Sequence, residues 1–209
     1  TADLFADWAP EDSGPAPLGP GAVVLRGFVR AEAAAVLAEL DGLLARAPLR
    51  TMQTPGGRSM SVATSNCGER GWVSDAAGYR YASVDPLGGA PWPAIPPLWH
   101  TLAGQAAAAA GFAGFTPDAC LINRYAPGAR MGLHQDRDEA DFAWPIVSFS
   151  FGLPAVFLFG GLRRSDPATR VPLFHGDAVV WGGPLRLAFH GVAPVKPGEH
   201  PLTGACRIM

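Results

Sequence analysis

The sequence has little charge and no large excess of either sign. Charged residues make up 16% of the chain, whereas an average globular protein has about 25%. The formal net charge of −2 gives no overall attraction to phosphate backbones. Any binding of nucleic acid would therefore have to depend on a local patch, and composition alone favours neither a binding nor a non-binding protein.

Paired cysteines are also absent. Cys67, Cys120 and Cys206 are odd in number and far apart along the chain. They show neither the spacing of a zinc site nor that of a secreted disulfide framework. We interpret them as buried thiols in a reducing compartment.

The sequence shows no targeting or membrane-spanning pattern. Its first eight residues are acidic and lack the basic flank and apolar stretch of a signal peptide. The most apolar window, Pro145–Leu162, is interrupted by Pro154 and several glycines, and residues 147–151 alternate as a strand does. We therefore expect a soluble, cytoplasmic protein that acts as a monomer and does not bind membranes.

Apolar residues, glycine and proline are plentiful instead. Hydrophobic residues make up 48% of the chain, enough for one continuous core, and 26 Gly and 21 Pro indicate many turns. We expect residues 1–20 to form an extended N-terminal lead-in and residues 21–209 to form a single domain. No internal repeat is evident.

Hydrophobic periodicity predicts two helices followed by many short strands. One amphipathic helix is expected over Ala31–Ala47 and ends at Pro48, and a second runs from Pro97 to about Ala110. After Gly114 short apolar runs predict antiparallel strands: Cys120–Tyr125, Ile146–Leu153, Ala155–Phe159, Ala178–Trp181 and Leu187–Val192. The predicted fold class is α+β, mainly β: a double-stranded β-helix, or jelly roll, of about eight strands with the helices packed on one face.

His134 and Asp136 are the first candidates for a metal site. In extended backbone two residues separated by one point to the same face. Two histidines and one carboxylate leave three positions of an octahedral ion open for a chelating cosubstrate and O₂. A third ligand could be His175, which precedes a Gly-Asp turn signal, or His190, which lies in a predicted strand. Spacing does not choose between them, and an isolated His-x-Asp can also simply cap a turn.

Longer blocks of sequence resemble the AlkB family of DNA-repair dioxygenases. The matching blocks occur in one order over nearly the whole chain: Thr54–Gly57, Ser59–Ser61, Asn66–Gly68, Gly71–Trp72, Trp92–Pro93, Pro117–Ala129, Leu133–Asp136, Phe159–Gly161 and His175–Gly183. The resemblance implies a nucleotide-recognition region at about residues 50–95 and a jelly-roll core at about 117–209. It also implies that Fe(II) is bound by His134, Asp136 and His190, with His175 left in a turn.

The same resemblance implies a site for 2-oxoglutarate, which is consumed together with O₂. Leu121, Asn123 and Tyr125 correspond to cosubstrate-binding positions, and Arg207 matches the arginine that receives the distal carboxylate, a task suited to a guanidinium. The family has an asparagine two positions after this arginine and a second arginine further on, whereas Met209 stands here and the sequence ends. Either the given polypeptide lacks its last strand or it binds the cosubstrate more weakly.

The expected substrate is alkylated DNA, single- or double-stranded. Trp72, Tyr79 and Tyr81 match positions that line the nucleotide pocket, where a base taken out of the stack would rest on aromatic rings. Asp138 matches a carboxylate that faces the base, and it would favour a cationic methylated ring. Arg164 matches a substrate-contacting arginine. It and Arg130, which stands where the family often has lysine, are candidates for phosphate contacts.

Together these matches imply direct-reversal DNA repair by oxidative demethylation of bases such as N1-methyladenine and N3-methylcytosine, with release of formaldehyde, succinate and CO₂. The sequence leaves three alternatives open. They are the same chemistry on RNA or a methylated protein, a non-catalytic nucleic-acid-binding relative, and a hydrolytic metal-binding jelly roll.

Overall fold

The computed structural model describes residues 14–209, and the first thirteen residues of the expected lead-in lie outside this range. Two helices, one short 3₁₀ turn and fifteen strands are present in the described part. The N-terminal half holds β1 (Ala16–Gly19), β2 (Ala22–Leu25), α1 (Ala33–Leu44), β3 (Arg50–Gln53), β4 (Ser59–Gly68), β5 (Gly71–Asp75), β6 (Gly78–Ala82) and α2 (Pro97–Ala109).

The rest of the chain is built almost entirely from strands. In order these are β7 (Ala119–Tyr125), β8 (Met131–His134), β9 (Ile146–Phe149), β10 (Phe151–Gly152), β11 (Ala155–Phe159), β12 (Thr169–Leu173), β13 (Ala178–Trp181), the 3₁₀ turn Gly183–Leu185, β14 (His190–Val192) and β15 (Arg207–Ile208).

The strands form a jelly roll, as expected. They are arranged in three larger sheets, with strand orders β1-β2-β13-β9, β10-β15-β7-β4-β3 and β12-β11-β14-β8, and the hairpin β5–β6 stands beside them. One core cluster gathers side chains from strands of all three larger sheets, including Val24, Val62, Phe157, Leu173 and Val179. The hydrophobic core therefore fills the space between the sheets.

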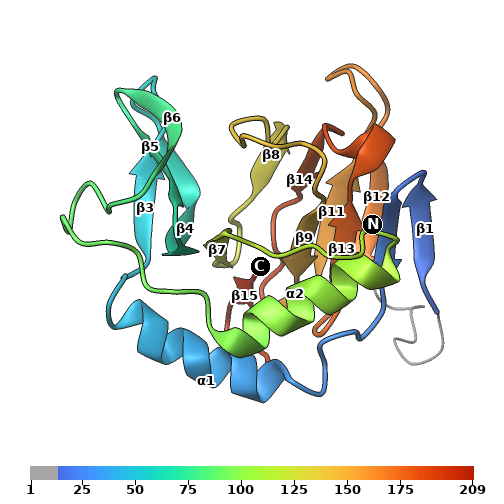
Figure 1. The fold of residues 1–209 in the computed structure, drawn as a ribbon, viewed down its shortest axis with the longest axis horizontal. Coiled ribbons are helices and arrows are strands. Elements are labelled where there is room, and N and C mark those ends of the chain that lie inside the picture. Colours follow the sequence, from blue (N-terminus) through green and yellow to red (C-terminus); the bar gives the residue numbers. More distant parts are fainter. Residues whose placement is uncertain (1–13) are drawn as a thin grey trace.

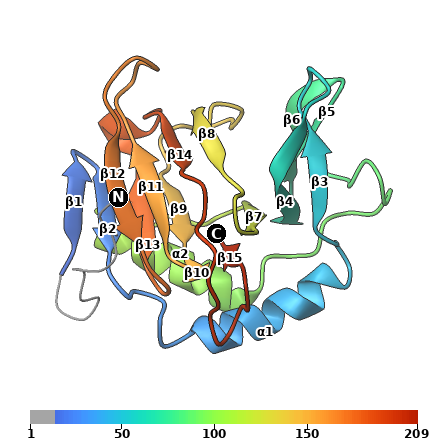
Figure 2. The same ribbon diagram turned by 180° about the vertical axis from the view of Figure 1, so that it is seen from behind.

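Both helices pack on one side of the strands, which confirms the predicted arrangement (Figure 1, Figure 2). Val36, Leu40 and Leu43 of α1 recur at helical spacing and are buried against Ile122 of β7 and Phe151 of β10. The second helix begins at a proline, the position that needs no N–H donor. Its alanines Ala106 and Ala107 are fully buried, so the Ala run is a packing face.

Two strand predictions were wrong in detail. The predicted strand Ile146–Leu153 divides at Ser150, because β9 pairs with β13 in one sheet and β10 pairs with β15 in another. The predicted strand Leu187–Val192 begins only at His190, because the residues before it continue from the 3₁₀ turn. The expectation that strands follow the helices was incomplete, since β1 to β6 precede α2.

Among the described residues, neither helix combines the length and apolar character needed to cross a membrane.

A buried ion pair fixes the turn between β12 and β13. The carboxylate of Asp177 is 2% exposed and accepts hydrogen bonds from the Arg26 guanidinium at 2.7 Å, the Gly27 N–H at 2.9 Å and the Phe174 N–H at 2.9 Å. It thus joins this turn to the end of β2.

We expect Asp177→Ala to lower the free energy of unfolding by about 3–5 kcal/mol, because it leaves a buried guanidinium without its carboxylate. Urea denaturation of the purified protein measures this change. The matched control is Asp75→Ala, which removes a pair with Arg80 of similar length, 2.7 Å, at the surface and should have a much smaller effect. Equal losses in the two variants would contradict the structural role of Asp177.

Candidate active site

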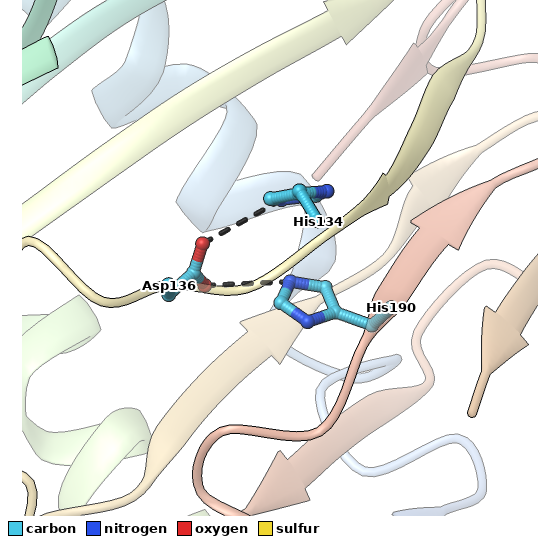
Figure 3. Close-up of side chains that lie close together, drawn as sticks. All are labelled: His134, Asp136 and His190. Atoms are coloured by element: carbon cyan, nitrogen blue, oxygen red, sulfur yellow. Dashed lines mark ion pairs between the residues drawn. The ribbon is translucent and has the colours of Figure 1, made fainter. Parts of the chain in front are cut away.

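Strand pairing brings two histidines together. His134 ends β8 and His190 begins β14, and the two residues are direct partners in the antiparallel ladder. Their ring centroids are 4.3 Å apart. Asp136 lies in the loop two residues after His134 and turns its carboxylate toward both rings (Figure 3).

The donor atoms of these three side chains face a common point. The Asp136 carboxylate lies 3.5 Å from Nε2 of His134 and 3.4 Å from Nε2 of His190, and all three ligand atoms lie within 4.8 Å of one another. Each histidine Nδ1 is 2.9–3.1 Å from a backbone carbonyl, that of Gly132 or of Ala188. Donation from Nδ1–H leaves the Nε2 lone pair free for a metal. Two imidazoles and one carboxylate fit the donor set of a non-haem Fe(II) site.

Local electrostatics favour the protonation states that bind metal. Burial, reinforced by the nearby His190, lowers the pKa of His134. For Asp136 burial alone would raise the carboxyl pKa, but the contact with His190 and the proximity of His134 and Arg186 outweigh burial and hold the pKa below its usual value. A neutral imidazole and an ionised carboxylate are therefore present together at neutral pH.

His175, the other sequence candidate, lies in the turn after β12 and outside this cluster. Its Nδ1 accepts a hydrogen bond from the Gly152 N–H at 3.1 Å, and its ring stacks on that of His200 with centroids 4.3 Å apart. The structure thus brings His190, and not His175, to His134 and Asp136.

The residues expected to hold 2-oxoglutarate lie next to the cluster. The three metal-ligand candidates line a groove on the protein. Alternate residues of β7 line the same groove: Leu121, Asn123 and Tyr125. Two buried polar atoms, Oδ1 of Asn123 and Nε of Arg207, have no hydrogen-bond partner among the described residues. Buried polar atoms are normally satisfied, so these fit a polar ligand.

Arg207 is fully buried and does not itself line the groove. It stands opposite Tyr125 in the ladder between β15 and β7. Its guanidinium donates to the Leu153 carbonyl at 2.9 Å and to the Ser150 hydroxyl at 2.6 Å. Burial lowers the pKa of Arg207 to about 10, although Tyr125 and Asp177 act in the opposite direction. A buried cation of this kind is stabilised by an anion, which suits a carboxylate ligand. Met209 continues the ladder through two hydrogen bonds with the backbone of Asn123.

The aromatic candidates form the opposite wall of the groove. Trp72 of β5 and Tyr79 of β6 stack with centroids 5.5 Å apart and planes inclined by 15°. The Trp72 indole N–H donates to the Asp138 carboxylate at 3.2 Å, and the Tyr81 hydroxyl donates to Glu139 at 3.1 Å. The hairpin β5–β6 is thereby tied to the loop that follows Asp136.

The two arginine candidates differ in their surroundings. Arg164 is exposed and lines the groove, where its guanidinium donates to the Leu133 carbonyl at 2.8 Å and lies over the Phe189 ring. Arg130 is also exposed, and its backbone exchanges hydrogen bonds with the Ser61 hydroxyl. The groove has a volume of about 1650 Å³, well above the roughly 300–1,000 Å³ of a typical small-molecule pocket.

Sequence reasoning missed three residues that hold this arrangement together. Arg186 is 4% exposed and donates to the backbone carbonyls of Asp136 and Trp144, both at 2.9 Å. Its third nitrogen lies 3.4 Å from Glu139, which also accepts from Tyr81. Asn66 of β4 clamps the Trp72 backbone with hydrogen bonds of 2.9 and 3.0 Å. Asn66 lies within one of the blocks that resemble the AlkB family. No spacing or periodicity in the sequence indicated a role for Arg186, Glu139 or Asn66.

Fold and site together define an Fe(II)- and 2-oxoglutarate-dependent oxygenase, and comparison with known proteins shows the same class. The model of the 2OG-Fe(II) oxygenase superfamily matches residues 21–209. The chain is 57% identical to alpha-ketoglutarate-dependent dioxygenase AlkB of Salmonella typhimurium and 53% identical to that of Escherichia coli. Each match covers 98% of this chain and 94% of the relative. The solved structure of OsALKBH1 superimposes with a TM-score of 0.80 at 29% identity, covering 93% of this chain and 97% of that one. The chain belongs to the AlkB family of these dioxygenases.

The geometry predicts which histidine completes the metal site. We expect His190→Ala to weaken binding of Mn(II), a redox-stable substitute for Fe(II), by at least about tenfold, because it removes one of three protein ligands. His175→Ala is the matched control and should bind Mn(II) as the unaltered protein does. Calorimetric titration measures both affinities. Loss of binding in the His175 variant alone would show that the third ligand is misassigned.

Proposed function

We propose that this enzyme removes alkyl groups from damaged bases in DNA by oxidative demethylation. The observation that carries the proposal is that one groove contains both the His134–Asp136–His190 cluster and the aromatic wall of Trp72, Tyr79 and Tyr81. Relatives that are more than half identical over nearly the whole chain carry the name AlkB. The groove has room for a cosubstrate and a nucleotide together.

In this proposal His134, Asp136 and His190 would hold Fe(II) at the wall of the groove. Bound Fe(II), with 2-oxoglutarate and O₂, supplies the oxidation that converts an N-methyl group to formaldehyde and releases succinate and CO₂. Arg207 attracts the distal carboxylate of 2-oxoglutarate, while Leu121, Asn123 and Tyr125 line its site. The chain's own contribution is to orient the methyl group and to exclude water.

The base would be recognised by stacking and by charge. A flipped base can rest on the Trp72–Tyr79 wall, because every base has a π-face. Asp138 is exposed at this wall, and its contact with the Trp72 N–H leaves the second carboxylate oxygen available. A ring methylated at N1 of adenine or N3 of cytosine is cationic and is attracted to this carboxylate, unlike the neutral base.

The rest of the chain would serve this reaction as one unit. Residues 21–209 form a single catalytic domain, and β3 to β6, within residues 50–95, form the recognition region. Arg164 stands at the rim of the groove and Arg130 at the surface, where both can meet phosphate oxygens. We propose that the enzyme works as a monomer and takes DNA in preference to RNA.

Mass spectrometry of a methylated oligonucleotide tests the proposal. We expect the protein with Fe(II), 2-oxoglutarate and O₂ to remove the mass of one methylene group from N1-methyladenine in DNA. His134→Ala, which lacks one metal ligand, should leave the oligonucleotide unchanged. A matched RNA oligonucleotide shows whether the preference for DNA holds. Unchanged DNA together with succinate formed on another substrate would contradict the proposal.

Recognition by charge makes a sharper prediction about Asp138. Asp138→Asn keeps the size of the side chain but removes its attraction for a cation. We therefore expect kcat/KM to fall more for cationic N1-methyladenine than for neutral N1-methylguanine in otherwise identical oligonucleotides. Asp141→Asn, in the same loop, is the matched control and should leave the ratio of the two values unchanged. An unchanged ratio in the Asp138 variant would mean that its role is to position Trp72.

A further inference from the structure

Two of the three cysteines are cross-strand neighbours. Cys67 of β4 and Cys120 of β7 are direct partners in the antiparallel ladder, although 53 positions separate them in the sequence (120 − 67). Cys67 is completely buried, whereas Cys120 is half-buried and lines the groove. Cys206 lies elsewhere, and its thiol donates to the Thr203 carbonyl at 3.1 Å.

The ladder fixes how the pair is oriented. The backbone N–H and C=O of Asn123 form hydrogen bonds of 2.8 and 2.9 Å with the backbone of Met209, the residue after β15. Successive residues of a strand direct their backbone N–H and C=O groups to opposite edges. The N–H and C=O of Cys120, which lies three positions before Asn123, therefore point toward β4. Cys67 and Cys120 therefore form a hydrogen-bonded pair with Cα atoms about 5.5 Å apart, inside the roughly 4.4–6.8 Å range that a disulfide spans. Both side chains leave the sheet on the same face.

The two thiols also differ in reactivity. The interaction between the two thiols raises the pKa of Cys67 and lowers the pKa of Cys120. Nucleophilic attack requires a thiolate that a reagent can reach. A reagent can reach Cys120 because it lines the groove, and the lowered pKa favours its thiolate. Cys67 lies directly opposite it in the ladder, where it can resolve an oxidised sulfur.

We propose that Cys67 and Cys120 are a reversible dithiol–disulfide pair that hydrogen peroxide closes from the groove. The Cys120 thiolate attacks one peroxide oxygen, so that an S–O bond forms, the O–O bond breaks and hydroxide leaves to become water. The Cys67 sulfur then attacks the Cys120 sulfenic acid, which forms the S–S bond and releases a second water. Two thiols lose two electrons in total, and one peroxide is reduced to two waters.

The bond would act on both walls of the groove. Opposed Cβ atoms in a ladder are about 4.5–5.5 Å apart, whereas a disulfide requires about 3.5–4.5 Å, so closure draws β4 and β7 together. Asn66, next to Cys67, clamps Trp72, and Leu121, next to Cys120, lines the cosubstrate side. Strained disulfides are readily reduced, which makes the change reversible. The effect on turnover rests on the proposed function, whereas formation of the bond does not.

The test begins with the reduced full chain freed of iron, because iron would decompose the peroxide. The protein is exposed to hydrogen peroxide, treated with catalase and alkylated with iodoacetamide before peptide mass mapping. We expect a mass lower by about two hydrogen atoms, one Cys67–Cys120 linked peptide and alkylation at Cys206 alone. Dithiothreitol should restore all three thiols. Cys206→Ser should behave in the same way, and Cys120→Ser should form no intramolecular link.

Three outcomes would overturn the proposal: no reaction, oxidation of Cys120 to sulfinic acid without a link, or a link that includes Cys206.

The second measurement is turnover. The linked protein reloaded with Fe(II) should demethylate at least about tenfold more slowly, because displacements of about 1 Å at a reacting centre cost this much or more. Its rate should recover after reduction. Peroxide should not change the rate of Cys120→Ser. Linkage without a change in rate would refute the coupling to the groove. Absence of demethylation by the reduced protein would refute the proposed function and leave the disulfide standing.

Discussion

The antiparallel pairing of β8 with β14 is the constraint on which the site depends. It sets His134 and His190 opposite one another with ring centroids 4.3 Å apart, a spacing that no loop would maintain as reliably. β14 is held in turn by β11, where Phe159 pairs with His190. Asp136 has no strand of its own, and its backbone is fixed instead by the buried guanidinium of Arg186. The rigidity of the cluster thus comes from the sheet and from one buried cation.

A second set of contacts joins the two halves of the groove. The Asn66 side chain connects β4 to the backbone of Trp72, and β4 pairs with β7, the strand that carries Asn123 and Tyr125. On the other side Arg186 contacts Glu139, which accepts from Tyr81. The aromatic wall is therefore joined through β4 to β7, and through Glu139 to the loop that follows Asp136. Cys67 faces Cys120 where β4 pairs with β7, directly next to the pair formed by Asn66 and Leu121.

Local patterns in the sequence predicted the elements that depend on local physics. The spacing of Val36, Leu40 and Leu43 sufficed for α1, and the proline and glycine signals sufficed for the limits of α2. His-x-Asp indicated half of a metal site, but the choice between His175 and His190 depends on which strand pairs with β8. Only the resemblance to a family made that choice. The break at Ser150, the role of Arg186 and the meeting of Cys67 with Cys120 arise from contacts between distant segments, which periodicity does not encode.

The most direct test is a crystal structure of the full chain with Mn(II) and 2-oxoglutarate. We expect the ion to be bonded to Nε2 of His134, Nε2 of His190 and the Asp136 carboxylate, at about 2.0–2.2 Å, as transition-metal ions are bound by such ligands. The distal carboxylate of 2-oxoglutarate should lie against Arg207, with the cosubstrate beside Asn123 and Tyr125. An ion at His175 and His200, or a cosubstrate that does not approach Arg207, would contradict this account of the site.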